Sequence, residues 1–143
     1  MLKNTGITVA LAMLSMVGAL GIDAYLPSFP AIIQDFQATP LAVQQTLSIY
    51  VGAMAITTLF AGTLSDSFGR RPTVIVSLLL FTAGSALAIF AKDIQVLLVA
   101  RALQGVAAGF GSVLSRTIVQ DRFQGAEAQR VMALIMMVFS IAP

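Results

Sequence analysis

The chain has 143 residues, of which 58% are hydrophobic and only 10% are charged, with a net charge of +2. Soluble domains carry about 25% charged residues, so this composition indicates a membrane protein whose main partner is the lipid bilayer, and the small positive charge predicts no nucleic-acid partner. The absence of cysteine and histidine excludes disulfides and thiolate metal sites, and because the six acidic residues are scattered we expect neither an enzyme nor a cofactor.

Five apolar segments follow one another along the chain, and each of the first four can cross a membrane as a helix of about 20 residues. The second is preceded by Thr39-Pro40 and the fourth by Asp93, which are typical of helix starts. We therefore expect an all-α membrane protein with four transmembrane helices, the start of a fifth, and no soluble domain. The segments are 7–26, 41–64, 73–91, 94–119 and 131–143.

Lysine and arginine residues in the short connections predict the orientation of the chain, because positive charge is retained on the cytoplasmic side. Lys92 lies alone on one side of the membrane. Six basic residues lie on the other side: Lys3, Arg70, Arg71, Arg116, Arg122 and Arg130. The N-terminus is therefore expected in the cytoplasm, and residues 27–40 and 92–93 outside. Lys3 could also begin a cleaved signal peptide, but the apolar run that follows exceeds the roughly 7–15 residues of a signal core.

Two of the predicted helices carry an ionisable group, and such groups normally face a bundle interior or a watery cavity. Asp23 lies near the outer end of the first helix, and Arg101 lies seven residues into the fourth, which enters from the same side. At a rise of about 1.5 Å per residue, the two side chains lie at similar depths in the membrane. They could therefore form an ion pair in which the carboxylate of Asp23 takes up and releases a proton. Alternatively, Asp23 is solvated near the headgroups, and Arg101 forms a structural pair or extends outward.

One face of the fourth helix combines polar and small residues at three- and four-residue spacing. Arg101 and Gln104 begin this face, and Gly105 and Gly109 continue it. The polar pair predicts a cavity lining, for which Tyr50 of the second helix is a further candidate. The glycines allow another helix to approach closely, as in a helix that slides or rocks, although simple packing would also account for them.

The connection GTLSDSFGRRP gathers charge and glycine between the second and third helices. It holds Gly62, Asp66, Gly69 and the pair Arg70-Arg71. A glycine here can supply a tight turn with positive φ, and the arginines alone would fit a cytoplasmic loop. The combined spacing, Gly-x-x-x-Asp-x-x-Gly-Arg-Arg, resembles the signature loop of the major facilitator superfamily of secondary transporters.

This resemblance implies a gating role for the loop, which in that family latches the two halves of the transporter on the cytoplasmic side. Asp66 would hold a helix of the opposite half, and Arg70 would balance its charge with the acidic residue after the fourth helix, Asp121. The family usually has a basic residue directly after the aspartate. This chain has Ser67 there, so one latch contact differs.

Two further segments resemble motifs of the same family. VLLVARALQGVAAG, residues 96–109, is similar to the helix-four motif, which implies that Arg101 assists proton coupling. GIDAYLPSFPAI, residues 21–32, together with the closing VFSIAP, is similar to drug/proton antiporters with twelve helices, and more narrowly to the Bcr/CflA-type multidrug efflux subfamily. The resemblance implies export of small-molecule drugs, such as bicyclomycin, across the bacterial inner membrane, driven by the proton gradient without a cofactor.

The expected number of helices differs from that family, whose members have two halves of six helices with the site between them. The sequence ends where the family's helix-five motif would begin. We therefore interpret it as an N-terminal fragment that lacks the C-terminal half and does not transport alone. Two alternatives remain open: a non-transporting remnant or subunit that needs a second chain, and a transporter of a metabolite or sugar.

Overall fold

The computed structural model of the chain describes residues 5–141, and every element within this range is helical. Lys3 and the last two residues of the fifth predicted span lie outside the described residues. Within the described residues, four stretches are long and apolar enough to cross a membrane, so the all-α membrane fold predicted from the sequence is confirmed. The elements are α1 (Thr5–Asp23), the 3-10 turn η1 (Leu26–Ser28), α2 (Phe29–Asp35), α3 (Pro40–Phe68), α4 (Arg70–Ile89), α5 (Ile94–Arg122) and α6 (Gly125–Ile141).

The first membrane-spanning stretch is interrupted near its outer end. Helix α1 ends at Asp23, and the chain passes through η1 into α2, so part of the predicted 27–40 connection is helical. Pro27 and Pro30 account for the interruption, because a proline has no N–H to donate to the carbonyl four residues earlier. The sequence placed the end of this helix at residue 26, where its apolar run stops.

The helix starts predicted from Thr39 and Asp93 are confirmed. The hydroxyl of Thr39 accepts a hydrogen bond from the main-chain N–H of Ala42 at 3.2 Å. The carboxylate of Asp93 accepts one from Val96 at 2.9 Å. Each satisfies a donor that the first turn of a helix leaves free, which fixes where α3 and α5 begin.

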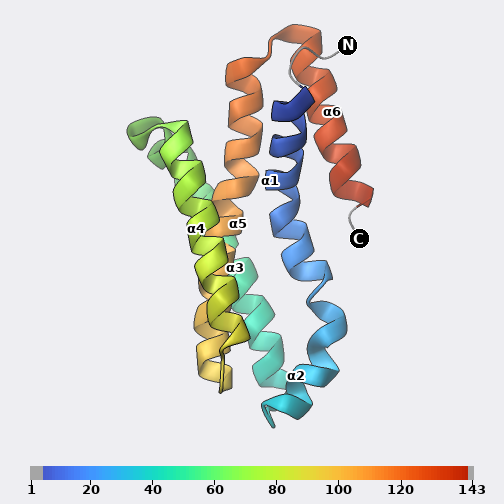
Figure 1. The fold of residues 1–143 in the computed structure, drawn as a ribbon, viewed down its shortest axis with the longest axis vertical. Helices are drawn as coiled ribbons and strands as arrows, with labels where there is room; N and C mark the ends of the chain where they lie inside the picture. The colour runs from blue at the N-terminus through green and yellow to red at the C-terminus, as the bar shows by residue number, and fades with distance from the viewer. Residues whose placement is uncertain (1–4, 142–143) are drawn as a thin grey trace.

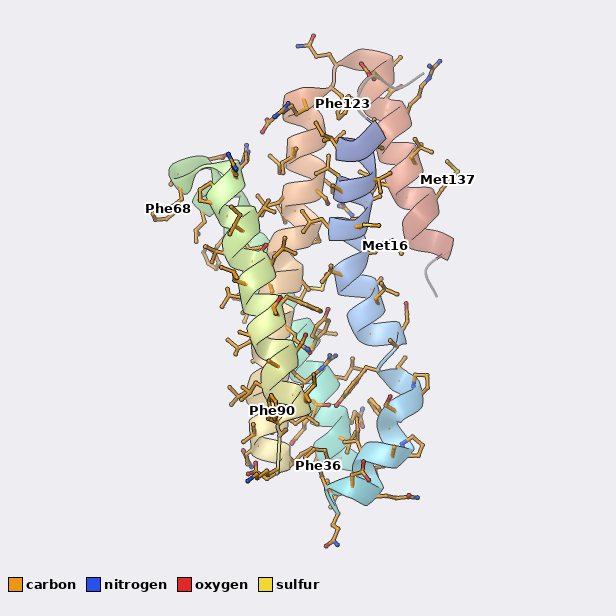
Figure 2. The ribbon with its side chains drawn as sticks, in the orientation of Figure 1. Met16, Phe36, Phe68, Phe90, Phe123 and Met137 are labelled. Atoms are coloured by element: carbon orange, nitrogen blue, oxygen red, sulfur yellow. The ribbon has the colours of Figure 1, made fainter. Side chains whose placement is uncertain are left out.

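Helix α5 is the centre of the bundle. In Figure 1 it lies between α4 and α1, with α6 beside α1 and α3 crossing behind. Half of the most apolar part of α5 is buried, against 11% for the corresponding parts of α3 and α4. Large apolar side chains are exposed on the outside; Phe68, for example, is 74% exposed and points away from the bundle in Figure 2. This distribution is expected of helices surrounded by lipid rather than water.

Two glycines lie where α5 crosses α3. A Cβ atom added at Gly109 would lie 2.7 Å from Cβ of Thr57 and 2.8 Å from the main-chain oxygen of Met54. One added at Gly105 would lie 3.0 Å from Cβ of Ala53. The main chains of the two helices therefore approach each other closely because these positions carry no side chain.

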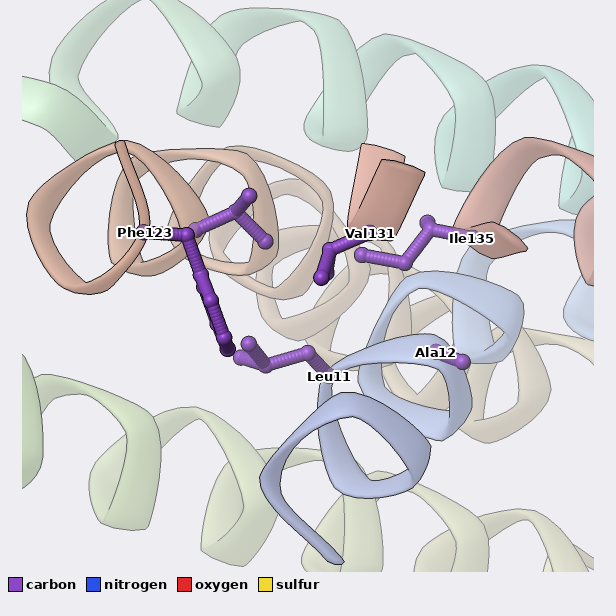
Figure 3. Close-up of a cluster of buried hydrophobic side chains, with 6 residues drawn as sticks. Leu11, Ala12, Phe123, Val131 and Ile135 are labelled. Atoms are coloured by element: carbon purple, nitrogen blue, oxygen red, sulfur yellow. The ribbon is translucent and has the colours of Figure 1, made fainter. Parts of the chain in front are cut away.

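A separate group of buried apolar side chains joins α1 to α5 and α6, as Figure 3 shows. None of its members is more than 7% exposed. Helix α6 reaches this position because the chain turns sharply at Gly125, whose φ of 55° is a left-handed value that favours glycine. The members are Leu11, Ala12, Val119, Phe123, Val131 and Ile135.

We expect Gly109→Ala to destabilise the bundle by about 1–3 kcal/mol, the usual cost of overpacking. The measurement is unfolding of the protein in detergent micelles by increasing amounts of sodium dodecyl sulfate. Gly52→Ala is the matched control, because a Cβ there meets no atom within 4 Å and alanine is the better helix former by about 1 kcal/mol. Equal destabilisation by both substitutions would contradict the close-contact explanation.

Candidate functional site

The interruption after α1 leaves a main-chain carbonyl without its usual helical donor. The N–H of Tyr25 donates to the carbonyl of Ile22, three residues back, at 3.1 Å. In a continuous helix it would donate to Gly21, four residues back. The Gly21 carbonyl is therefore available to another donor, and in an apolar bundle it needs one.

Arg101 of α5 supplies that donor. Its guanidinium is buried, with the residue only 4% exposed; Nη2 donates to the Gly21 carbonyl at 2.8 Å, and Nη1 donates to Oε1 of Gln104 at 2.8 Å. Nε2 of Gln104 in turn donates to the hydroxyl of Ser85 on α4 at 3.0 Å. A chain of hydrogen bonds therefore runs from the interruption in the first helix, across α5, to α4.

Two tyrosine rings pack against the same guanidinium. The ring centroids of Tyr25 and Tyr50 lie 4.1 and 4.2 Å from Cζ of Arg101, which is close enough for cation–π attraction. The hydroxyl of Tyr50 donates to the Gly18 carbonyl at 2.9 Å, and the hydroxyls of Tyr25 and Thr46 share a hydrogen bond of 2.6 Å. Nε of Arg101 has no hydrogen-bond partner among the described residues, so the rings offset part of the cost of burying the charge.

Asp23 is not part of this cluster. Among the side chains that the structure describes, it forms no ion pair or hydrogen bond, and Arg101 is bonded to Gly21 and Gln104 instead. The Asp23–Arg101 ion pair considered from the sequence is therefore not formed here. Of the other predicted cavity residues, Gln104 and Tyr50 both lie against Arg101.

Sequence reasoning did not identify Gly21, Tyr25 or Ser85 as members of the cluster. A Cβ at Gly21 would lie 2.5 Å from the hydroxyl oxygen of Tyr50, so this glycine leaves the space that the tyrosine ring fills. The sequence signal that could have pointed to Gly21 is its spacing of three residues from Gly18, which puts both glycines on one face of the first helix. The residue that packs against them, however, depends on how α1 and α3 meet, which the sequence does not show.

A second polar cluster lies at the other end of α5. Helix α3 continues to Phe68, into the connection predicted at 65–72, and Gly69 makes the turn with a φ of 94°, a left-handed value. Helix α4 begins directly afterwards at Arg70. Gly62, the first residue of the signature, has open space around it, because a Cβ there would meet no atom within 4 Å.

Arg70 connects this turn to α5. Its Nε donates to Oδ2 of Asp121 at 2.8 Å, and its Nη1 lies 2.5 Å from Oδ1 of Asp66 and also donates to the hydroxyl of Ser65. One guanidinium therefore contacts carboxylates on two helices. The side chain of Asp66 is 65% exposed, so it can accept a further partner. Arg71 forms no ion pair among the described residues.

The fold and these two clusters define a multi-pass helical membrane protein with a charge network in its interior and a charged turn at one end of the bundle. A comparison with protein families identifies the group. The sequence profile of the Major Facilitator Superfamily matches residues 11–143, and the chain belongs to this superfamily.

Curated relatives are similar over most of the chain. An uncharacterized MFS-type transporter of Bacillus subtilis, YdgK, is 40% identical over 93% of the chain. A bicyclomycin resistance protein homolog of Haemophilus influenzae is 36% identical over 99% of the chain, and multidrug resistance protein D of Escherichia coli is 28% identical over 99%. The chain spans 33% to 36% of the length of these three relatives.

Replacing Arg101 with lysine should loosen the end of α1. Lysine keeps the charge but lacks the planar fork that bonds two acceptors and stacks on the rings. Hydrogen–deuterium exchange of the protein in lipid nanodiscs should rise about tenfold at residues 20–26, equivalent to about 1.4 kcal/mol of opening free energy. Arg122→Lys, at the end of the same helix, is the control and should change nothing there. Unchanged exchange at residues 20–26 in Arg101→Lys would show that α1 holds its end without the guanidinium.

Proposed function

We propose that this chain is part of a proton-coupled exporter of small-molecule drugs in the bacterial inner membrane. The observation that carries the proposal is the buried cation of Arg101, held at the interruption of the first helix in a member of the Major Facilitator Superfamily. Charges inside a membrane bundle are costly and usually mark an ion or substrate pathway. Relatives named for multidrug and bicyclomycin resistance support drugs as the substrates.

In this proposal Asp23 carries the proton. It is partly exposed at the last position of α1, two residues from the Gly21 carbonyl to which Arg101 is bonded. A movement of α1 that breaks this bond would free the guanidinium and bring a positive charge into reach of the carboxylate, which favours its ionised form. Arg101 is then the positioning residue that couples the movement of α1 to the protonation of Asp23.

The cluster around Arg70 is the proposed cytoplasmic gate. The concentration of arginine near this end of the bundle favours a cytoplasmic position, and the exposed carboxylate of Asp66 suits contact with a further helix. We propose that this helix belongs to the remainder of a longer transporter, because the chain spans only about a third of its relatives. Transport is therefore expected of that longer protein and not of these helices alone.

The proton-carrier role predicts that Asp23→Asn uncouples export from the proton gradient. Asparagine keeps the size and polarity of the side chain but cannot titrate. Drug-induced proton release from the purified, complete transporter should fall at least about fivefold, within the usual range of coupling between two linked sites. Asp35→Asn, which removes an exposed carboxylate at the end of α2, should release protons as the unmodified protein does. Undiminished release from Asp23→Asn would place the proton carrier elsewhere.

The gating role predicts that Asp66→Asn reduces drug export without reducing the amount of protein in the membrane. The substitution removes a charge contact that only one conformation uses, so it shifts the balance between conformations. Cells expressing the variant should lose about fivefold or more of their drug resistance. Glu127→Gln, at an exposed position of α6, controls for the loss of one negative charge. Full resistance in the Asp66→Asn strain would exclude the gating role.

A further inference from the structure

A groove between α1, α3 and α5 has the size of a ligand site. Its volume is about 570 Å³, and small-molecule pockets usually measure roughly 300–1,000 Å³. None of the side chains around Arg101 contributes to its wall, so it is distinct from the cluster at the interruption of the first helix. Its wall includes Ser15, Gly18, Met54, Thr58, Ser112 and Arg116.

Arg116 gives this groove its electrostatic character. It is the one charged residue among the described residues that line the groove, and none of the chain's acidic residues lies in the wall. It is exposed, and among the described side chains it forms neither an ion pair nor a hydrogen bond. A guanidinium on the C-terminal half of α5, with its donors free, is suited to a carboxylate, sulfonate or phosphate group.

The hydroxyl groups in the rest of the wall offer the anion no further hydrogen-bond donor. The hydroxyls of Ser15, Thr58 and Ser112 donate to carbonyls of their own helices, at 2.7, 2.7 and 2.9 Å. Their oxygens remain as acceptors, but they have no proton to offer to an anion. Met54 lies against Gly18 and provides an adaptable apolar surface, since a thioether side chain fits many shapes. The wall thus offers one strong anion donor beside an apolar, deformable surface.

We propose that this groove binds amphipathic anions, whose charged group pairs with Arg116 and whose apolar body lies against Met54 and Gly18. The inference rests on the proposed function for its biological meaning, because it names the class of compound that such an exporter would select. A cation of the same size would bring its charge toward Arg116 without a carboxylate to compensate, so the groove discriminates by the sign of the charge.

The test compares two fluorescent probes that share one aromatic framework, anilinonaphthalene sulfonate, which is anionic, and the uncharged phenylnaphthylamine. Binding is measured to the protein in nanodiscs of zwitterionic lipid, after subtraction of empty nanodiscs. Arg116→Gln should weaken binding of the sulfonate about tenfold, the loss of one charge-assisted hydrogen bond. It should change binding of the uncharged probe less than about twofold, and Arg116→Lys should restore most of the sulfonate affinity.

Two further variants locate the effect. Arg130→Gln removes a positive charge from α6, outside the groove, and should leave both affinities unchanged. Ser112→Phe fills the groove and should weaken binding of both probes.

The inference is overturned if Arg116→Gln leaves sulfonate binding unchanged, which is expected if Arg116 extends to lipid headgroups. It is overturned equally if Arg130→Gln has the same effect as Arg116→Gln, or if Ser112→Phe has none. If the binding pattern holds while no drug export is found, the proposed function fails and the site remains.

Discussion

The hydrogen bond from Arg101 to the Gly21 carbonyl is the interaction on which the end of the bundle around the interrupted first helix depends. Neither partner is tolerable alone: a bare carbonyl and an isolated guanidinium are both costly in an apolar interior. The interruption of the first helix therefore requires a donor from α5, and the buried charge of Arg101 requires an acceptor. Tyr25 and Tyr50 complete the arrangement by packing their rings on the cation.

Close packing of α5 makes this interaction possible. Gly109 and Gly105 allow α3 to lie against α5 without intervening side chains, and the same approach brings Tyr50 of α3 to Arg101. The small residues and the polar cluster are thus two parts of one arrangement. A side chain at Gly105 would press on the main chain of Tyr50, whose ring covers the cation, so packing and electrostatics at this end of the bundle are linked.

Much of the fold could be predicted from local signals. The length of the apolar runs gives the spans, and Thr39 and Asp93 mark two helix starts through contacts only three residues apart. The surroundings of Arg101 could not be predicted in this way. Opposite charge suggested Asp23 as the partner. The structure instead pairs the guanidinium with the Gly21 carbonyl, which has no helical donor because Pro27 and Pro30 interrupt the helix. The contact of Arg70 with Asp121 joins residues far apart in the sequence, and it was expected from the family resemblance alone.

The apolar group between α1 and α6 has a consequence for how the chain is made. Leu11 and Ala12 are synthesised about 120 residues before Val131 and Ile135, against which they finally pack. In water, a helix face left uncovered for so long would invite aggregation. In the bilayer this delay costs little free energy, because lipid tails are as apolar as the side chains that replace them. Lipid therefore covers the apolar face of α1 during biosynthesis, and the contact between α1 and α6 can form late without exposing that face to water.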